Sequence, residues 1–341
     1  MGPVYLLIGG LALEASAILL MGFSVEYAAL VGLAMVVGMG HAVFHPADYT
    51  ILSANVDEKS IGKAFSIHTF SGHLGYAPPP ALFGLLLLFL DWRQTLIIAG
   101  CIGFPVMVWI VLASPHLSTH PIRSPDPQGM KPSEKTTAPI GFSSLLTKPM
   151  ILLFLFFIVT AFTSHVVRAF SVSAFGFTQG LSTASAAGLL SSYLFASALG
   201  VLAGGMIVDR VKRHDLVAAA GFTVAAIMMV MFSAVPLPVL VIGVLFSIVG
   251  GIQGMIRPAR DMMVRAATPP GGVGKAFGFF STGMSISGAS APILFGGLVD
   301  RGNPEWVFYS IAIFMYFGIF SIIGSQRASS RKAAINGGGE T

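Results

Sequence analysis

Three ionisable side chains recur at helical spacing within an otherwise apolar stretch. They are His41, His45 and Asp48, and intervals of four and three residues place them on one face of an α-helix. An ionisable group inside a membrane helix costs at least about 2.5 kcal/mol unless it faces a partner or a water-filled cavity. The cluster therefore predicts either a site for an anion or a proton, or polar contacts that join helix ends near the membrane surface.

Two further clusters carry arginine. Arg257, Arg260 and Asp261 are close in sequence, and His165 lies three residues before Arg168. A guanidinium can hold an acidic group through two parallel hydrogen bonds, so Arg168 or Arg257 can bind a carboxylate or phosphonate. Simpler roles also fit: Arg257 and Asp261 are spaced for an ion pair within one helix, and Arg168 can reach the outer interface with its long side chain. The sequence leaves these alternatives open.

The composition is that of an integral membrane protein. Hydrophobic residues make up 55% of the 341 residues and charged residues only 10%, against about 25% charged residues in soluble domains. The single cysteine, Cys101, excludes a disulfide within the chain and argues against a cysteine-ligated metal site. No phosphate-binding loop of the P-loop type is present, so we expect neither an enzyme nor an ATP-driven pump, and no cofactor.

Ten apolar segments are long enough to cross a hydrocarbon core of about 30 Å. They cover residues 4–23, 27–55, 62–90, 94–113, 150–174, 184–208, 215–235, 238–267, 274–299 and 305–325. An even number of spans places both termini on one side. The positive-inside rule assigns that side to the cytoplasm, because only Arg93 and Arg301 then lie outside. The net positive charge thus follows membrane topology, and we expect no binding of nucleic acid.

A polar, proline-rich segment divides the chain. Residues 115–148 are too polar to span a membrane or to pack a core, which predicts a cytoplasmic linker. The expected organisation is an N-terminal bundle of four helices over residues 1–114, this linker, a six-helix bundle over residues 149–326, and a cytoplasmic tail over residues 327–341.

A diverged internal repeat relates the two bundles. Residues 45–47 (HPA) match residues 257–259 (RPA), and residues 62–65 match residues 274–277 (GKAF in both), each 212 residues later without a gap. A period this long relates two halves of a molecule, and two related helical halves are typical of membrane transporters. Because Met1 falls on the middle of the second half at this offset, we expect that about two helices of the first half are missing.

The segment GMIVDRVKRH at residues 205–214 resembles the cytoplasmic signature of the major facilitator superfamily, G-x-x-x-D-R-x-G-R-R/K. Gly205, Asp209, Arg210 and Arg213 match the signature, and two other positions depart from it. Together with the repeat, this resemblance covers the whole chain. It implies an all-α membrane protein of two helical bundles, with ten transmembrane helices of the family's twelve, and a cytoplasmic gate at the four matching residues.

Shorter motifs refine the resemblance. Residues 40–46, GHAVFHP, are similar to a segment of fosmidomycin-resistance-type efflux proteins, and Gly75 with Pro80 resembles the proline-glycine motif of antiporter helix five. Pro80 and its repeat partner Pro292 are expected to bend their helices and to shape a gate. Ala34 stands where many proton-coupled drug antiporters carry an arginine, which argues against exchange of drug for proton.

We therefore expect a secondary transporter that exports a small organic compound by alternating access. The resemblance implies that family helices four, seven and ten line a central cavity, whose ionisable residues would be His41, His45, Asp48, His165, Arg168, Arg257, Arg260 and Asp261. The alternatives are an ion-coupled importer of an organic anion and a truncated remnant that transports nothing. The expected partners are the substrate, protons and the lipid bilayer, for a monomer in the inner membrane.

The signature generates a prediction for Asp209. Its carboxylate is expected to hold the cytoplasmic gate closed by facing the positive end of a helix that begins near Gly274, a contact worth about 0.3 to 1 kcal/mol. Asp209→Asn keeps the shape and removes the charge, so we expect transport in proteoliposomes to slow by about two- to fivefold. An ordinary basic loop at this position would leave the rate unchanged, and that result would rule out the latch.

Overall fold

All regular secondary structure in the described part of the chain is helical. The computed structural model describes residues 3–44, 47–48, 51–52, 56, 61–116, 147–208, 213–268 and 273–337. Within these residues, eight helices are long and apolar enough to cross a membrane. They are α1 (Pro3–Phe23), α6 (Trp92–Ala113), α7 (Lys148–Gln179), α8 (Thr183–Val208), α9 (His214–Ala234), α10 (Val239–Ala267), α11 (Val273–Asp300) and α12 (Trp306–Gly337).

The two remaining expected spans differ from single continuous helices. The first begins as α2 (Tyr27–Ala42), a shorter apolar helix. The second is divided into α4 (Ile61–Gly75) and α5 (Pro78–Leu86). The division has a local cause, since consecutive prolines supply no N–H groups and disfavour a helical conformation in the residue before them.

The prolines expected to bend helices occupy different positions in their helices. Pro80 lies in the first turn of α5, where proline is tolerated because that N–H would have no partner within the helix. The helix is therefore interrupted before Pro80, at Tyr76 and Ala77, rather than at Pro80 itself. Pro292 lies inside α11, which continues through it to Asp300.

The residues group into two compact units. Unit 1 comprises Met1–Ser71 and Leu85–Lys135, and unit 2 comprises Gly72–Gly84 and Thr136–Thr341. The boundary between the units therefore falls inside α4 and again near the end of α5. Gly75 and Pro80 accordingly belong to unit 2, together with α7 to α12.

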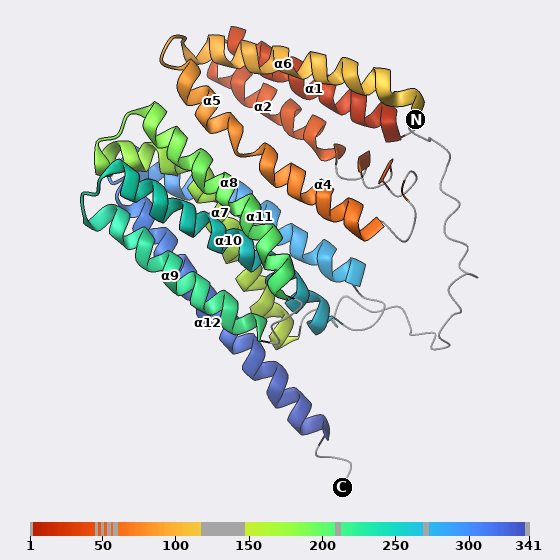
Figure 1. Cartoon of the computed structure of the whole chain (residues 1–341), viewed down its shortest axis with the longest axis vertical. Coiled ribbons are helices and arrows are strands. Elements are labelled where there is room, and N and C mark those ends of the chain that lie inside the picture. The colour runs from red at the N-terminus through yellow and green to blue at the C-terminus, as the bar shows by residue number, and fades with distance from the viewer. Residues whose placement is uncertain are drawn as a thin grey trace. The chain divides into compact units, whose positions relative to one another are not determined.

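Unit 1 is built around α1, which packs against α2 and α6 (Figure 1). Glycines allow these helices to approach at their backbones: a Cβ on Gly40 would lie 2.7 Å from the carbonyl oxygen of Gly10, and one on Gly100 would lie 2.7 Å from Cα of Leu19. Asp91 caps the start of α6, where its carboxylate accepts a hydrogen bond of 2.8 Å from the backbone N–H of Gln94.

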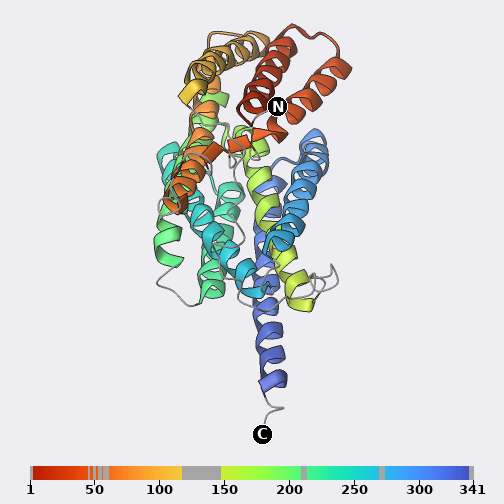
Figure 2. The same ribbon diagram turned by 90° about the vertical axis from the view of Figure 1, so that its right-hand side faces the viewer.

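Unit 2 is a bundle in which α7 packs against α8, α11 and α12, while α10 packs against α8 and α9. Aromatic side chains fill its core. Phe175 of α7 contacts Phe232, Phe246 and Phe308, which come from α9, α10 and α12, and all four rings are fully buried. In both views α12 extends past the other helices of unit 2 at its C-terminal end (Figures 1 and 2). The expected tail at residues 327–341 therefore begins as a continuation of α12.

The tightest helix pair in unit 2 is α8 with α10. A Cβ on Gly250 would overlap the carbonyl oxygen of Tyr193, and a Cβ on Gly254 would overlap that of Ser197. Both contacts advance by four residues along each helix, so α8 and α10 run parallel at this contact. Small residues spaced by four thus bring the two backbones together, as in other membrane helix pairs.

Adjacent glycines on α8 provide a matched test of this packing. A Cβ on Gly204 would lie 2.6 Å from the carbonyl oxygen of Met255 and 2.8 Å from its Cα, whereas a Cβ on Gly205 would meet nothing within 4 Å. We expect Gly204→Ala to cost about 1 to 3 kcal/mol, because α10 must move away, and to lower the thermal unfolding midpoint in detergent. Gly205→Ala should not lower it. Equal midpoints for the two variants would contradict the close approach of α8 and α10.

Candidate functional site

The arginines of α7 and α10 lie on helices that run antiparallel within unit 2. At the C-terminal end of α7, Gln179 donates hydrogen bonds to the carbonyl oxygens of Phe232 and Val235 and accepts one from the N–H of Leu237, just before α10 begins. Toward the other end of α7, the ring of Phe157 lies 3.8 Å from the guanidinium carbon of Arg260 on α10. These contacts fix the two helices in opposite directions.

Arg168 is anchored to its own helix and to the segment before α5. Its Nε donates to the carbonyl oxygen of Ser164 at 3.2 Å, and its guanidinium carbon lies 5.4 Å above the ring of Tyr76. The side chain is partly exposed. Among the described residues no carboxylate lies within ion-pair distance of it. Its remaining N–H groups are therefore available to a ligand.

Arg257 is a second arginine with no carboxylate within ion-pair distance among the described residues. It is partly exposed and interacts electrostatically with Tyr193, Arg260, Arg168 and Asp261. Within the described part of the chain it makes no hydrogen bond or ion pair. Arg257 is therefore acted on by two further arginines and a single carboxylate, so its surroundings carry an excess of positive charge.

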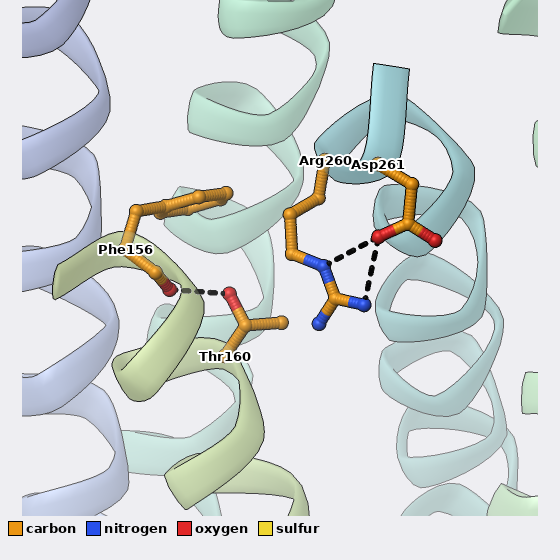
Figure 3. Close-up of polar contacts among 4 residues, drawn as sticks. All are labelled: Phe156, Thr160, Arg260 and Asp261. Atoms are coloured by element: carbon orange, nitrogen blue, oxygen red, sulfur yellow. Dashed lines mark hydrogen bonds and ion pairs between the residues drawn. The ribbon is translucent and has the colours of Figure 1, made fainter. Parts of the chain in front are cut away.

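Arg260 has its partners inside the protein (Figure 3). Its Nε and Nη2 donate to Oδ1 of Asp261 at 3.1 and 3.0 Å, and its guanidinium stacks over Phe157. Figure 3 shows the side chain reaching from α10 toward α7, where Thr160 donates to the carbonyl oxygen of Phe156 at 2.8 Å. The possible ion pair between Arg257 and Asp261 is therefore not formed, because Asp261 binds Arg260 instead.

His165 is held between α7 and α11. Its Nδ1 lies 2.8 Å from the carbonyl oxygen of Ala161, and because a carbonyl oxygen only accepts, Nδ1 carries the proton in this contact. On the other side, Nε2 lies 3.3 Å from where a Cβ of Gly288 would be. His165 also interacts electrostatically with Arg168 and Arg257. It thus borders the arginine pair as a fixed, partly buried ring.

Two close pairs of a histidine and a carboxylate lie in the described part of unit 1. Nδ1 of His41 lies 3.8 Å from Glu14 of α1, whereas Asp48 lies 3.6 Å from Nε2 of His68 on α4. Asp48 and His68 also line a mostly apolar cavity of about 230 Å³. α2 ends at Ala42, and helical residues resume at Phe44. The expected common face of His41, His45 and Asp48 therefore stays a prediction. His45 lies outside the described residues.

The sequence matches the Major Facilitator Superfamily over residues 1–256 and, in a second match, over residues 168–338. The chain belongs to this superfamily. No curated protein sequence matches it. Membership and the apolar helices together make it a multi-pass membrane protein of a transporter family.

Solved structures show the same fold. A bacterial homologue of the human lysosomal transporter Spinster, inward-facing and unoccupied, has a TM-score of 0.69 at 16% identity, over 96% of this chain and 84% of that one. The occupied form of that homologue gives 0.68 at 14% identity, over 96% and 82%. A point mutant of the nucleoside transporter NupG gives 0.74 at 13% identity, over 95% and 84%.

The expected cytoplasmic gate of this superfamily member is described only in part. Gly205 lies near the end of α8, and Arg213 precedes α9. Nε and Nη2 of Arg213 donate to the two carboxylate oxygens of Asp215 at 3.1 and 3.0 Å. Asp209 and Arg210 lie outside the described residues, so the latch stays a prediction.

Several polar residues of the site were not predicted. Tyr193 and Ser197 of α8 and Gln253 of α10 are buried, and in the described structure their side-chain polar atoms have no hydrogen-bond partner. The sequence could have identified Gln253 as a candidate, since it is an amide in an apolar segment four residues before Arg257. As for metals, the described residues contain no group of three His, Cys, Asp or Glu side chains placed to hold an ion.

The contrast between Arg260 and the other arginines leads to a stability prediction. The Arg260 side chain is only 11% exposed, against 45% for its partner Asp261. We expect Asp261→Asn to lower stability by about 1 to 2 kcal/mol, because it leaves a mostly buried guanidinium without its carboxylate. Thermal unfolding in detergent would measure the loss.

An exposed arginine supplies the control. Arg301 lies in the exposed turn after α11 and makes no ion pair among the described residues, and an exposed charge contributes little to stability. Arg301→Gln should therefore leave the unfolding midpoint nearly unchanged. A midpoint for Asp261→Asn as high as that of the unchanged protein would mean that Arg260 does not depend on this contact.

Proposed function

We propose that this protein is a secondary active transporter that carries a small organic anion by alternating access. The proposal rests on one observation. Arg168 and Arg257 are partly exposed, repel each other electrostatically, and have no carboxylate within ion-pair distance among the described residues. An anion that binds both guanidiniums would compensate them.

The energetic argument concerns the membrane. An unpaired arginine within a membrane helix is costly, and such residues in membrane proteins generally mark a substrate or ion pathway. Arg260 shows how this chain compensates a guanidinium permanently, through Asp261 and Phe157. Arg168 and Arg257 are not compensated in that way. Their charge is thus free to bind a carboxylate, phosphate or phosphonate by charge-assisted hydrogen bonds.

In this proposal the protein is a monomer in the inner membrane, and it exports its substrate. The resemblance of residues 40–46 to efflux proteins supports export, and the distribution of basic residues supports cytoplasmic termini. Import of the same kind of anion is the second candidate, because the arginine pair would serve either direction. Coupling to protons would use the carboxylate–imidazole pairs of unit 1, which can bind and release a proton. These pairs are Glu14 with His41 and Asp48 with His68.

The deciding experiment is transport in proteoliposomes with the purified chain. Uptake and efflux of carboxylates, phosphates and phosphonates are compared with those of neutral and cationic compounds, with and without a pH gradient. We expect transport of anions only. Arg168→Met and Arg257→Met should each lower it at least tenfold, because truncating one partner of a charge-assisted contact costs about 2 kcal/mol or more.

Two variants control for charge and shape. Arg301→Met removes a positive charge from an exposed turn after α11, and we expect it to leave transport unchanged. Arg257→Lys keeps the charge but not the planar pair of donors, so it should recover only part of the rate. Transport of neutral compounds that is insensitive to Arg168 and Arg257 would refute the anion proposal. An absence of all transport would favour a remnant that no longer transports.

A further inference from the structure

Four polar side chains in the described part of unit 2 are buried without a hydrogen-bond partner, and three of them come from α8 and α10. Gln253 and Tyr193 are 0% and 2% exposed, and Ser197 is 3% exposed. Both amide atoms of Gln253, the hydroxyl of Tyr193 and that of Ser197 make no hydrogen bond in the described structure. Buried polar atoms are almost always satisfied in proteins, so a group of four unsatisfied atoms needs an explanation.

The glycine contact between α8 and α10 places these side chains at one level. Gly250 and Gly254, which flank Gln253 in sequence, press against the backbone of Tyr193 and Ser197 respectively. Gln253 therefore lies between the levels of these two α8 residues. The ring of Tyr193 stacks on Phe246, with centroids 4.7 Å apart, which holds its orientation. We call Tyr193, Ser197 and Gln253 the neutral cluster.

The neutral cluster adjoins the arginine pair. Tyr193 interacts electrostatically with both Arg257 and Arg168. Gln253 precedes Arg257 by four residues on α10, which is about one helical turn and a rise of about 6 Å. Uncharged donors and acceptors therefore lie within the length of a small organic molecule from a guanidinium.

We propose that the neutral cluster is a hydrogen-bonding subsite that recognises an uncharged hydroxyl, carbonyl or amide group on the transported anion. This inference rests on the proposed function, because the arginine pair must bind the acidic group. Gln253 supplies two donors and an acceptor, and each hydroxyl supplies one donor and acceptor lone pairs. The cluster thus fits a group that both donates and accepts, such as a hydroxyl.

Burial is what makes this subsite selective. A binding site that leaves its own buried polar groups unpaired with the wrong ligand discriminates far better than an apolar pocket does. Arg257 is partly exposed and Gln253 fully buried, so the acidic group reaches the arginine first. Rotation about the side-chain torsions of Gln253 then lets its amide approach the ligand. The preferred substrates are therefore hydroxylated or amide-bearing organic anions rather than plain ones.

Two dianions of nearly equal shape test the subsite. Malate and methylsuccinate differ by a hydroxyl in place of a methyl group, so each is used to compete with transport of the anion taken up best in the panel. We expect the unchanged protein to prefer malate by about tenfold or more, as one or two hydrogen bonds would give. Gln253→Leu and Tyr193→Phe should each reduce that preference to about threefold or less.

Gln179→Leu is the matched control. It makes the same chemical change at a glutamine that is satisfied by Phe232, Val235 and Leu237, so it should lower stability and keep the preference for malate. In contrast, Gln253→Leu should not lower the unfolding midpoint, since it removes unpaired polar atoms.

The outcomes separate the two proposals. Equal competition by malate and methylsuccinate in the unchanged protein, or a preference that survives Gln253→Leu, overturns the subsite while the anion proposal stands. Competition by neither dianion, together with no effect of Arg257→Met on any transport, overturns both. A Gln253→Leu variant that unfolds more easily and weakens both competitors equally shows a structural polar cluster and refutes the subsite.

Discussion

The backbone contact between α8 and α10 determines how the candidate site is built. Where Gly250 and Gly254 meet the backbone of Tyr193 and Ser197, there is no room for a Cβ. This contact fixes how the two helices are aligned along their length. The same contact sets the level of Gln253 and, one turn further along α10, of Arg257. A shift of α10 would therefore move Gln253 and Arg257 together, relative to Tyr193 and Ser197 on α8. The packing of small residues here positions the candidate binding side chains and also holds the bundle together.

The three arginines of unit 2 show two ways to place a cation in a membrane protein. Arg260 is bound by Asp261 and covered by Phe157, so its charge is already compensated. Arg168 has a ring beneath it and one carbonyl contact, and Arg257 has no hydrogen bond in the described residues. Because an uncompensated charge in hydrocarbon is costly, the latter two are the groups that we propose to bind the substrate. Arg260 thus differs from Arg168 and Arg257 in the partners of its side chain, since all three residues are of the same type.

The sequence predicted the helical membrane fold and membership of the superfamily, because apolar runs and a long repeat depend on patterns spread over many residues. It also placed Arg168 and Arg257 among the candidate residues. Its spacing favoured Arg257 as the partner of Asp261, because residues four apart face each other on a helix and adjacent residues do not. The structure pairs Asp261 with the adjacent Arg260 instead. The sequence did not predict the pairs of His41 with Glu14 and of Asp48 with His68, which depend on contacts between helices. Tyr193 and Ser197 are too common in membrane helices to stand out by type alone.

The division of the site into arginines and neutral groups has a consequence for selectivity. Charge supplies attraction that every small anion shares, so Arg168 and Arg257 alone would bind acids with little discrimination. Discrimination requires protein groups that the wrong ligand leaves without a hydrogen bond, because this loss weakens the binding of that ligand. Buried Gln253 and Tyr193 meet that condition, because they cannot turn to water for hydrogen bonds when the ligand lacks one. In this proposal Arg257 and Gln253 lie on neighbouring turns of α10, while Arg168 and Tyr193 contribute from α7 and α8. Affinity and specificity then depend on different side chains, and each can change with little effect on the other.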